Sequence, residues 1–289
     1  MRVAVTGTTG RVGAALAHHL AKRHDVVPLP RNVCDLENPA SLTHALGKLE
    51  CDVLINPAGI TSVEACEDDP QMAMRVNSAA PGEMAEWAAQ NGVRLFHFST
   101  DYVFSGETSG LRTETETPNA LSVYGRSKLD GENAVLAQPG TCVIRVSWVF
   151  GPEKPSFIDQ TFEAAFAGRP LAAVADKFSL PTFTADLAEW IEILISKRPE
   201  GILHACNSGE PVSWHGMANV VVEEMLACGA IQSPMKITPL KLENVAAFRA
   251  VRPRHTAMDT SLLAKEIGEV PRHWRDAIQG YVRDRCALL

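Results

Sequence analysis

Short, nearly continuous apolar runs alternate along the first half of the chain with segments whose apolar residues recur every three or four positions. The continuous runs predict strands that are buried on both faces of a sheet. The other segments, such as 11–23 and 79–92, predict amphipathic helices, and Gly92 follows the second where a helix would end. Strands separated by helices predict a doubly wound parallel sheet, an α/β fold of the Rossmann type. The predicted strands lie at 2–7, 25–29, 51–59, 93–100 and 141–151.

The pattern changes after Gly151. A loop is followed by a helical segment at 158–168 and a strand-like run at 170–176. We expect the later helix at 185–197 and the strand at 201–209 to return to the first sheet. The predicted division is therefore 1–151 plus 182–206 for a dinucleotide-binding domain, and 152–181 plus 207–289 for a smaller α/β substrate-binding domain.

Composition narrows the function classes. Among 289 residues, 27 Lys and Arg against 34 Asp and Glu give a formal net charge of −7, which disfavours sequence-independent nucleic-acid binding. No apolar run is long enough to predict a membrane span. Seven cysteines without C-x-x-C spacing predict reduced thiols in a cytoplasmic protein. We find no metal-ligand spacing among the nine histidines and no G-x-S-x-G hydrolase motif.

The stretch "TGTTGRVG" places Gly7, Gly10 and Gly13 between the first predicted strand and the first helix. Such glycines allow a tight turn, close approach of the backbone to a diphosphate, and close packing of helix on strand. The helix N-terminus would then face the anion with free N–H groups. A glycine-rich turn without a ligand is the alternative, but the strand before and the helix after favour a dinucleotide site.

The second predicted strand is followed by Pro30 and Arg31 rather than by an acidic residue. An arginine there can bind a 2′-phosphate, so we expect NADP(H) to be preferred over NAD(H). The alternative is a solvated surface arginine; the preference for NADP(H) assumes that no carboxylate competes for Arg31. Asp35 either meets the adenine or caps the next helix.

The stretch "VYGRSKLDGE" places Tyr124 and Lys128 four residues apart on one helical face. Ionising a tyrosine near neutral pH requires about 4 kcal/mol, and an ammonium ~5 Å away supplies on the order of 3 kcal/mol at an effective dielectric of ~20. We therefore expect Lys128 to lower the pKa of Tyr124 and to make it a usable proton donor. Thr100, at the end of the fourth strand, would hydrogen-bond the same substrate oxygen. Chance occurrence of Y-x-x-x-K in a helix is the alternative.

Several stretches together resemble the dTDP-4-dehydrorhamnose reductase family, a group of extended short-chain dehydrogenase/reductases. They span nearly the whole chain and include "TGTTGRVG", "INPAGITSVEACE", "STDYVF", "VYGRSKLDGE", "RVSWVFG", "PTFTADLAE" and "VRPRHTAMDT". The resemblance implies a Rossmann domain with a smaller substrate domain. It also implies reduction of the 4-keto group of a nucleotide-linked 6-deoxysugar by NAD(P)H, so the expected partner is a nucleotide sugar.

The resemblance also implies roles for individual residues. Tyr124 would donate the proton, with Lys128 beside it and Thr100 at the keto oxygen. Trp148 and Asp101 would face the sugar nucleotide, although a strand tryptophan is as often part of a core. The residues expected to bind the cofactor are Gly7, Thr9, Gly10, Arg11, Val12, Arg31, Asp35, Leu36, Ala58, Gly59, Ile60, Thr61, Tyr124 and Lys128.

Some positions depart from the pattern of the family. Lys177 and Ser179 stand in "DKFSLPT" where the family usually has glutamine and glycine. Arg11 replaces a frequent glutamine, and Ala15 stands where some members carry a glutamate that binds a dimer-bridging magnesium ion. These changes leave open the exact sugar, the use of a metal and a homodimer.

Two other functions stay open at this level. The chain also resembles the regulatory beta subunit of methionine adenosyltransferase, a non-catalytic NADP-binding protein with a similar tyrosine–lysine pair. A different activated sugar or a natural-product ketone is the third alternative. All three alternatives share the dinucleotide-binding fold, so assays with substrates have to separate them.

Overall fold

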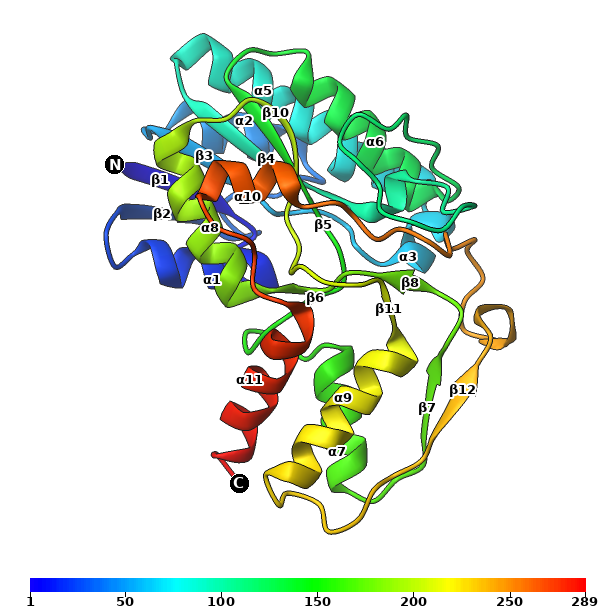
Figure 1. Cartoon of the computed structure of the whole chain (residues 1–289). Helices are drawn as coiled ribbons and strands as arrows, with labels where there is room; N and C mark the ends of the chain where they lie inside the picture. The colour runs from blue at the N-terminus through cyan, green and yellow to red at the C-terminus, as the bar shows by residue number, and fades with distance from the viewer.

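Six parallel strands form one sheet in the computed structural model, which describes residues 1–289. Their order across the sheet is β10-β5-β4-β3-β1-β2, and every neighbouring pair is parallel (Figure 1). The predicted Rossmann-type α/β fold is thus confirmed, including the return of the strand near residue 201 to the first sheet. The strands are β1 (Arg2–Thr6), β2 (Asp25–Leu29), β3 (Val53–Asn56), β4 (Arg94–Thr100), β5 (Thr141–Val146) and β10 (Gly201–His204).

Helices cover both faces of this sheet because successive strand residues point to opposite sides. Val3 and Val5 of β1 pack into one apolar cluster, and Ala4 between them packs into another. The first face carries α1 (Arg11–Leu20), α8 (Thr184–Lys197) and α10 (Ser261–Ile267). The second face carries α2 (Pro39–Gly47), α5 (Ala80–Asn91) and α6 (Val123–Leu136). Gly92 ends α5 at φ +67, as its position in the sequence predicts.

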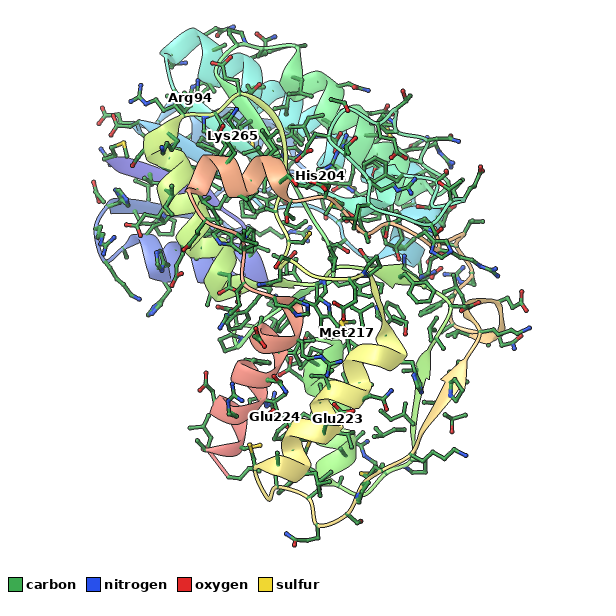
Figure 2. The ribbon with its side chains drawn as sticks, viewed as in Figure 1. Arg94, His204, Met217, Glu223, Glu224 and Lys265 are labelled. Atoms are coloured by element: carbon green, nitrogen blue, oxygen red, sulfur yellow. The ribbon has the colours of Figure 1, made fainter.

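A second group of elements lies below the carboxyl edge of the sheet (Figure 1). Its core is a separate cluster of 26 buried residues, which includes Met217 of α9 (Trp214–Ala227). The buried His204, by contrast, lies at the large sheet (Figure 2). Three short strand pairs and three helices build this group. They are β6 (Val149–Phe150) with β9 (Thr182–Phe183), β8 (Phe178–Ser179) with β11 (Val212–Ser213), β7 (Leu171–Val174) with β12 (Ile237–Leu240), and the helices α7 (Phe157–Phe166), α9 (Trp214–Ala227) and α11 (Trp274–Cys286).

Helix α10 departs from the division expected from the sequence, which assigned all of 207–289 to the smaller domain. Leu263 and Ile267 of α10 pack in the cluster that covers the first face of the sheet, beside α8. The apolar side of this short helix is thus buried against the sheet domain. Two further short helices, α3 (Val63–Asp68) and α4 (Pro70–Met74), lie before α5.

The run 141–151, predicted as one strand, is interrupted at Trp148. Its backbone has φ +42, which a bulky residue rarely adopts and which costs about 1–3 kcal/mol. The chain therefore leaves the large sheet after Val146 and begins β6 at Val149. This break turns the chain from the sheet toward the second group of elements. No helix of the chain combines the length and the apolar character needed to cross a membrane.

Candidate active site

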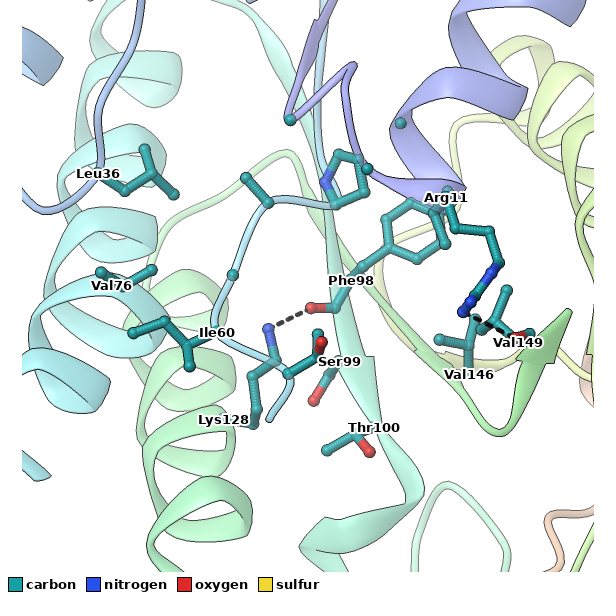
Figure 3. A pocket seen from close by; sticks show the side chains of 18 of the residues that line it. Arg11, Leu36, Ile60, Val76, Phe98, Ser99, Thr100, Lys128, Val146 and Val149 are labelled. Atoms are coloured by element: carbon teal, nitrogen blue, oxygen red, sulfur yellow. Dashed lines mark hydrogen bonds between the residues drawn. The ribbon is translucent and has the colours of Figure 1, made fainter. Parts of the chain in front are cut away.

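A cavity of about 690 Å³ opens at the carboxyl ends of β1, β3, β4 and β5, where ligands of doubly wound sheets bind. Figure 3 shows part of its wall, including residues of β4, of α6 and of the loop after β1. Every site residue expected from the sequence lines it. These residues are Gly7, Thr9, Gly10, Arg11, Val12, Arg31, Asp35, Leu36, Ala58, Gly59, Ile60, Thr61, Thr100, Asp101, Tyr124, Lys128 and Trp148.

The glycine loop has the shape of a diphosphate cradle. Gly7 adopts φ +56, and a Cβ at Gly13 would lie 2.3 Å from the carbonyl oxygen of Gly7. Gly10 precedes α1 without a side chain that caps the helix, so the first N–H groups of α1 face the cavity unpaired by a side chain. These features fit an anionic diphosphate at the helix N-terminus.

The side chain of Arg11 turns away from this cradle. Its guanidinium donates to the carbonyl oxygen of Val149 at 3.0 Å (Figure 3). It also donates to the carbonyl oxygens of Lys154 at 3.2 Å and Pro155 at 2.6 Å. It therefore ties the start of α1 to the segment that begins the second group of elements. The backbone N–H of Arg11 is left to meet an anion in the cradle.

At the far end of the cavity, Arg31 is paired with two carboxylates. Its Nε lies 3.5 Å from Asp35, and its guanidinium also forms an ion pair with Glu37. The assumption that no carboxylate competes for Arg31 is therefore wrong, because the sequence pattern does not place Glu37 beside it. Asn38 caps α2 through hydrogen bonds to Ala40 and Ser41, so the alternative role of Asp35 as a helix cap is also wrong.

The loop after β3 is fixed by Asn77, which the sequence reasoning missed. Asn77 is fully buried; it accepts from the N–H of Ile60 at 2.9 Å and donates to the carbonyl oxygen of Ile60 at 3.0 Å. It also donates to Ser127 of α6 at 3.1 Å. A Cβ at Gly59 would lie 2.9 Å from Oδ1 of Asn77, so only glycine fits there without displacement. Asn77 thus holds the 59–61 loop against α6.

Helix α6 approaches the end of β4 closely enough to join Tyr124 to Thr100. A Cβ at Gly125 would lie 2.3 Å from the carbonyl oxygen of Tyr102, so the glycine permits this contact. The rings of Tyr102 and Tyr124 pack edge to face, with centroids 5.5 Å apart. Burial raises the pKa of Tyr124 well above its ordinary value, and a hydrogen bond with Thr100 opposes that rise. The Tyr124 hydroxyl is accordingly protonated at neutral pH.

Lys128 lies beside the same groups but does not act on Tyr124 as the sequence predicts. Its buried ammonium donates to the carbonyl oxygen of Phe98 at 2.6 Å (Figure 3). It also lies 3.4 Å from Nε2 of His97. Burial lowers the pKa of Lys128 to about 8, and Lys128 is not among the groups that shift the pKa of Tyr124. The expected lowering of the Tyr124 pKa is therefore wrong for this arrangement, because the ammonium points to β4.

The sequence offered one signal for His97. Side chains alternate along a strand, so His97 shares a face of β4 with Ser99 at the carboxyl end. His97 is fully buried, and burial and the Lys128 charge lower its pKa well below its ordinary value. The ring is therefore neutral, and it lies beside the lysine as an uncharged neighbour.

Trp148 and Asp101 both line the cavity, but their surroundings differ. The indole of Trp148 is partly buried against Trp214, with ring centroids 5.6 Å apart. The carboxylate of Asp101 is 1% exposed and accepts hydrogen bonds from Thr100 and Ser179 at 3.2 and 3.1 Å. Asp101 is thus held by the protein's own hydroxyl groups.

Comparison with known proteins gives the family. The family model described as "RmlD substrate binding domain" matches residues 1–286. The dTDP-4-dehydrorhamnose reductase of Burkholderia thailandensis is 31% identical over 296 residues, which cover 98% of this chain and 99% of that protein. The chain belongs to the dTDP-4-dehydrorhamnose reductase family. It is therefore an oxidoreductase.

Solved structures of family members agree with this fold. A dTDP-4-dehydrorhamnose reductase from Clostridium acetobutylicum ATCC 824 superposes with a TM-score of 0.87 at 28% identity, covering 98% of each chain. The enzyme of the same name from Bacillus anthracis str. Ames, solved in complex with NADP, has a TM-score of 0.88 at 24% identity. That alignment covers 98% of this chain and 99% of the Bacillus chain. The family fold thus extends over both groups of elements.

Proposed function

We propose that the chain reduces the 4-keto group of a nucleotide-linked 6-deoxysugar with NADPH, a reaction of the type dTDP-4-dehydro-L-rhamnose to dTDP-L-rhamnose. The observation that carries this proposal is a single cavity with the glycine cradle at one end and the Thr100–Tyr124 hydroxyl pair at the other. Relatives named dTDP-4-dehydrorhamnose reductase align with almost the whole chain and support this substrate class. The smaller group of elements would then bind the sugar nucleotide.

The residues at the cradle fit a pyridine dinucleotide, which when bound supplies the hydride. The backbone N–H groups of Gly10, Arg11 and Val12 would hold the diphosphate at the start of α1. Asp35 and Leu36 would meet the adenine, and the loop at 59–61 would border the nicotinamide half. The NADP complex of the Bacillus anthracis protein supports this cofactor class.

A preference for NADPH over NADH would depend on Arg31. Its guanidinium can bind a 2′-phosphate through paired, charge-assisted hydrogen bonds. Because it is already paired with Asp35 and Glu37, a phosphate has to displace or share with those carboxylates. We therefore propose an NADPH preference that is smaller than an unpaired arginine would give.

Tyr124 would donate its hydroxyl proton to the keto oxygen as the carbonyl carbon is reduced. A donor has to carry its proton at working pH, and burial keeps Tyr124 protonated. Thr100 would donate a second hydrogen bond to the same oxygen and stabilise the negative charge that develops there. Lys128, charged below about pH 8, would place a positive charge in the cavity wall at the end of β4.

The decisive experiment incubates the purified protein with NADPH and dTDP-4-dehydro-L-rhamnose and follows cofactor oxidation and sugar product. Turnover that requires both compounds supports the proposal. The protein could instead bind NADPH and reduce neither this sugar nor any of a panel of other nucleotide-linked keto sugars. That result would be the behaviour of a regulatory NADP-binding subunit. Turnover of a different member of the panel would replace the sugar in the proposal while retaining the chemistry.

A further inference from the structure

Lys177 and Ser179, the two departures noted in "DKFSLPT", lie together beneath the sugar end of the cavity, and the proposed function gives neither a role. Both side chains are fully buried. The ammonium of Lys177 donates to the carbonyl oxygen of Pro253 at 2.7 Å. An ammonium has three donors, and a buried cation with one oxygen partner needs compensating charge nearby.

The compensating charge is Asp101. Burial lowers the pKa of Lys177 to about 8, and the nearby Asp101 carboxylate opposes that effect. The carboxylate itself is buried where the segment after β4 meets the smaller group of elements. Arg252 is the other charged group that acts on Lys177, and it lowers the pKa further. Asp101 and Lys177 are therefore two buried opposite charges that act on each other without a direct ion pair between them.

Three hydroxyl groups converge on the same carboxylate. Thr100 donates to Oδ1 at 3.2 Å, and Ser179 donates to Oδ2 at 3.1 Å. Thr256 also donates to Oδ2. The single proton of Thr100 is directed to Asp101, and its oxygen accepts from the N–H of Tyr102 at 3.2 Å.

This arrangement allows Thr100 to change partners. When a keto oxygen enters the cavity, Thr100 can turn its proton to it, because Ser179 and Thr256 still donate to Asp101. Ser179 is further held by Ser147, whose Oγ lies 2.7 Å away. Ser147 directly precedes Trp148, so the network reaches both sides of the sugar end.

The ammonium of Lys177 also lies against two aromatic rings of the cavity wall. It is 4.7 Å from the ring centroid of Tyr102 and 5.6 Å from that of Trp148, within the range of cation–π attraction. Trp148 has the left-handed backbone described above, so its indole direction depends on contacts that hold it. One buried cation thus contacts the indole and balances the carboxylate.

We propose that Lys177 is a positioning residue for the reduction, acting through Asp101 on the Thr100–Tyr124 hydroxyl pair and directly on the Trp148 indole. The inference rests on the proposed function, because it assigns these groups to the sugar. Lys177 does not touch the cofactor cradle, which lies at the other end of the cavity. Replacing Lys177 therefore has to affect turnover of the sugar more than it affects binding of the cofactor.

The test measures steady-state reduction of dTDP-4-dehydro-L-rhamnose and NADPH affinity for the unsubstituted protein and three variants. Lys177→Met should lower kcat at least tenfold, while the dissociation constant of NADPH changes less than twofold. Lys177→Arg, which keeps the cation, should recover at least a third of kcat. Lys236 is an exposed lysine far along the chain and serves as the control. Lys236→Met should have the same kcat and the same NADPH dissociation constant as the unsubstituted protein. A role in stability alone would instead weaken cofactor and sugar use together.

Two outcomes separate the failures. An unsubstituted protein that reduces no keto sugar refutes the proposed function, and the positioning role with it. An active protein whose Lys177→Met variant keeps kcat within twofold overturns the positioning role only. If Lys177→Met does not fold, Ser179→Ala replaces it, since it removes one donor to Asp101 without burying a new group. Ser179→Ala should lower kcat threefold or more at unchanged NADPH affinity, and an unchanged kcat would equally overturn the proposal.

Discussion

The ammonium of Lys128 donates a 2.6 Å hydrogen bond to the carbonyl oxygen of Phe98, which joins α6 to β4 beside the candidate reacting groups. Phe98 precedes Thr100 by two residues, and Lys128 follows Tyr124 by one helical turn. This bond therefore fixes the helix that carries the tyrosine against the strand that carries the threonine. The separation of the two hydroxyls depends on packing between elements rather than on a flexible loop.

Replacing Tyr124 by phenylalanine removes the proposed proton donor with little change in volume. We expect kcat to fall roughly 10²–10⁴-fold, since that is the usual contribution of a general acid. NADPH affinity should change less than about threefold. Steady-state kinetics and cofactor titration measure both quantities. Retention of full turnover by this variant would exclude Tyr124 as the donor.

Tyr281→Phe is the matched control. The hydroxyl of Tyr281 donates to Asp159 at 2.7 Å within the smaller group of elements, and Tyr281 does not line the cavity. This variant should lose about 1 kcal/mol of unfolding free energy. Its kcat should equal that of the unsubstituted protein.

Turnover should decline on the alkaline side because Lys128 loses its proton. With a pKa of about 8, Lys128 is mostly charged at pH 7, and roughly a tenth of the molecules still carry the charged ammonium at pH 9. We expect kcat to fall roughly tenfold over this interval. Lys128→Arg stays charged. Its profile should be flat there if Lys128 alone is responsible, whereas a residual decline would come from Lys177, whose pKa is also about 8.

The free energy of unfolding should rise with pH as Lys128 loses its proton, whereas turnover falls. The folded-state pKa of Lys128 lies below its ordinary value of 10.5, so burying the charged lysine is unfavourable below about pH 8. That penalty disappears as pH rises from about 8 toward 10.5. Urea unfolding of the unsubstituted protein and of Lys128→Met should therefore differ most below pH 8. An equal difference at pH 7 and pH 10 would contradict the assignment.

Gly13→Ala should impair the dinucleotide cradle. The added Cβ would lie 2.3 Å from the carbonyl oxygen of Gly7, so either α1 or the loop has to move. We expect a loss of about 1–3 kcal/mol in stability and at least a tenfold loss in NADPH affinity. Gly47→Ala, at the exposed end of α2, meets no atom within 4 Å and serves as the control. It should leave cofactor affinity unchanged and alter stability by less than about 1 kcal/mol.

Arg31→Ala should discriminate between the two nicotinamide cofactors. Loss of charge-assisted hydrogen bonds to a 2′-phosphate should lower kcat/KM for NADPH roughly 10- to 100-fold. The value for NADH should change less than about threefold. Glu37→Gln should act in the opposite direction and raise kcat/KM for NADPH, because it removes a carboxylate that pairs with the guanidinium. Equal losses for both cofactors in Arg31→Ala would leave Arg31 without a role in selectivity.

Local patterns were sufficient for much of the site. The glycines at 7, 10 and 13 and the four-residue spacing of Tyr124 and Lys128 are short-range features, and a strand-to-helix junction has few conformations compatible with them. Alternating apolar runs set the strands, and parallel strands bring their carboxyl ends to one edge. For that reason the predicted site residues, which run from Gly7 to Trp148, all line one cavity.

The directions of polar side chains could not be obtained in this way. Lys128 turns to Phe98 rather than acting on the tyrosine, and Arg31 finds Glu37, because each choice depends on which acceptors the folded chain leaves nearby. Asn77 was missed because nothing in its own neighbourhood marks it as the anchor of a loop seventeen residues earlier. The local sequence also gives no sign of the backbone turn at Trp148. The apolar run 141–151 continues through this residue, whereas the strand ends before it.

The amino-acid sequence by itself determined the parallel sheet, the glycine cradle and the identity of the groups at the strand ends, since periodicity and spacing act over a few residues. Only the tertiary structure decided how the charges are paired. Lys177 donates to the carbonyl oxygen of Pro253, 76 residues later, and the charge of Asp101, 76 residues earlier, acts on its ammonium. Helix α10 returns to the sheet domain. Burial removes water as the default partner of a charge, so its neighbours are set by the packing of distant segments.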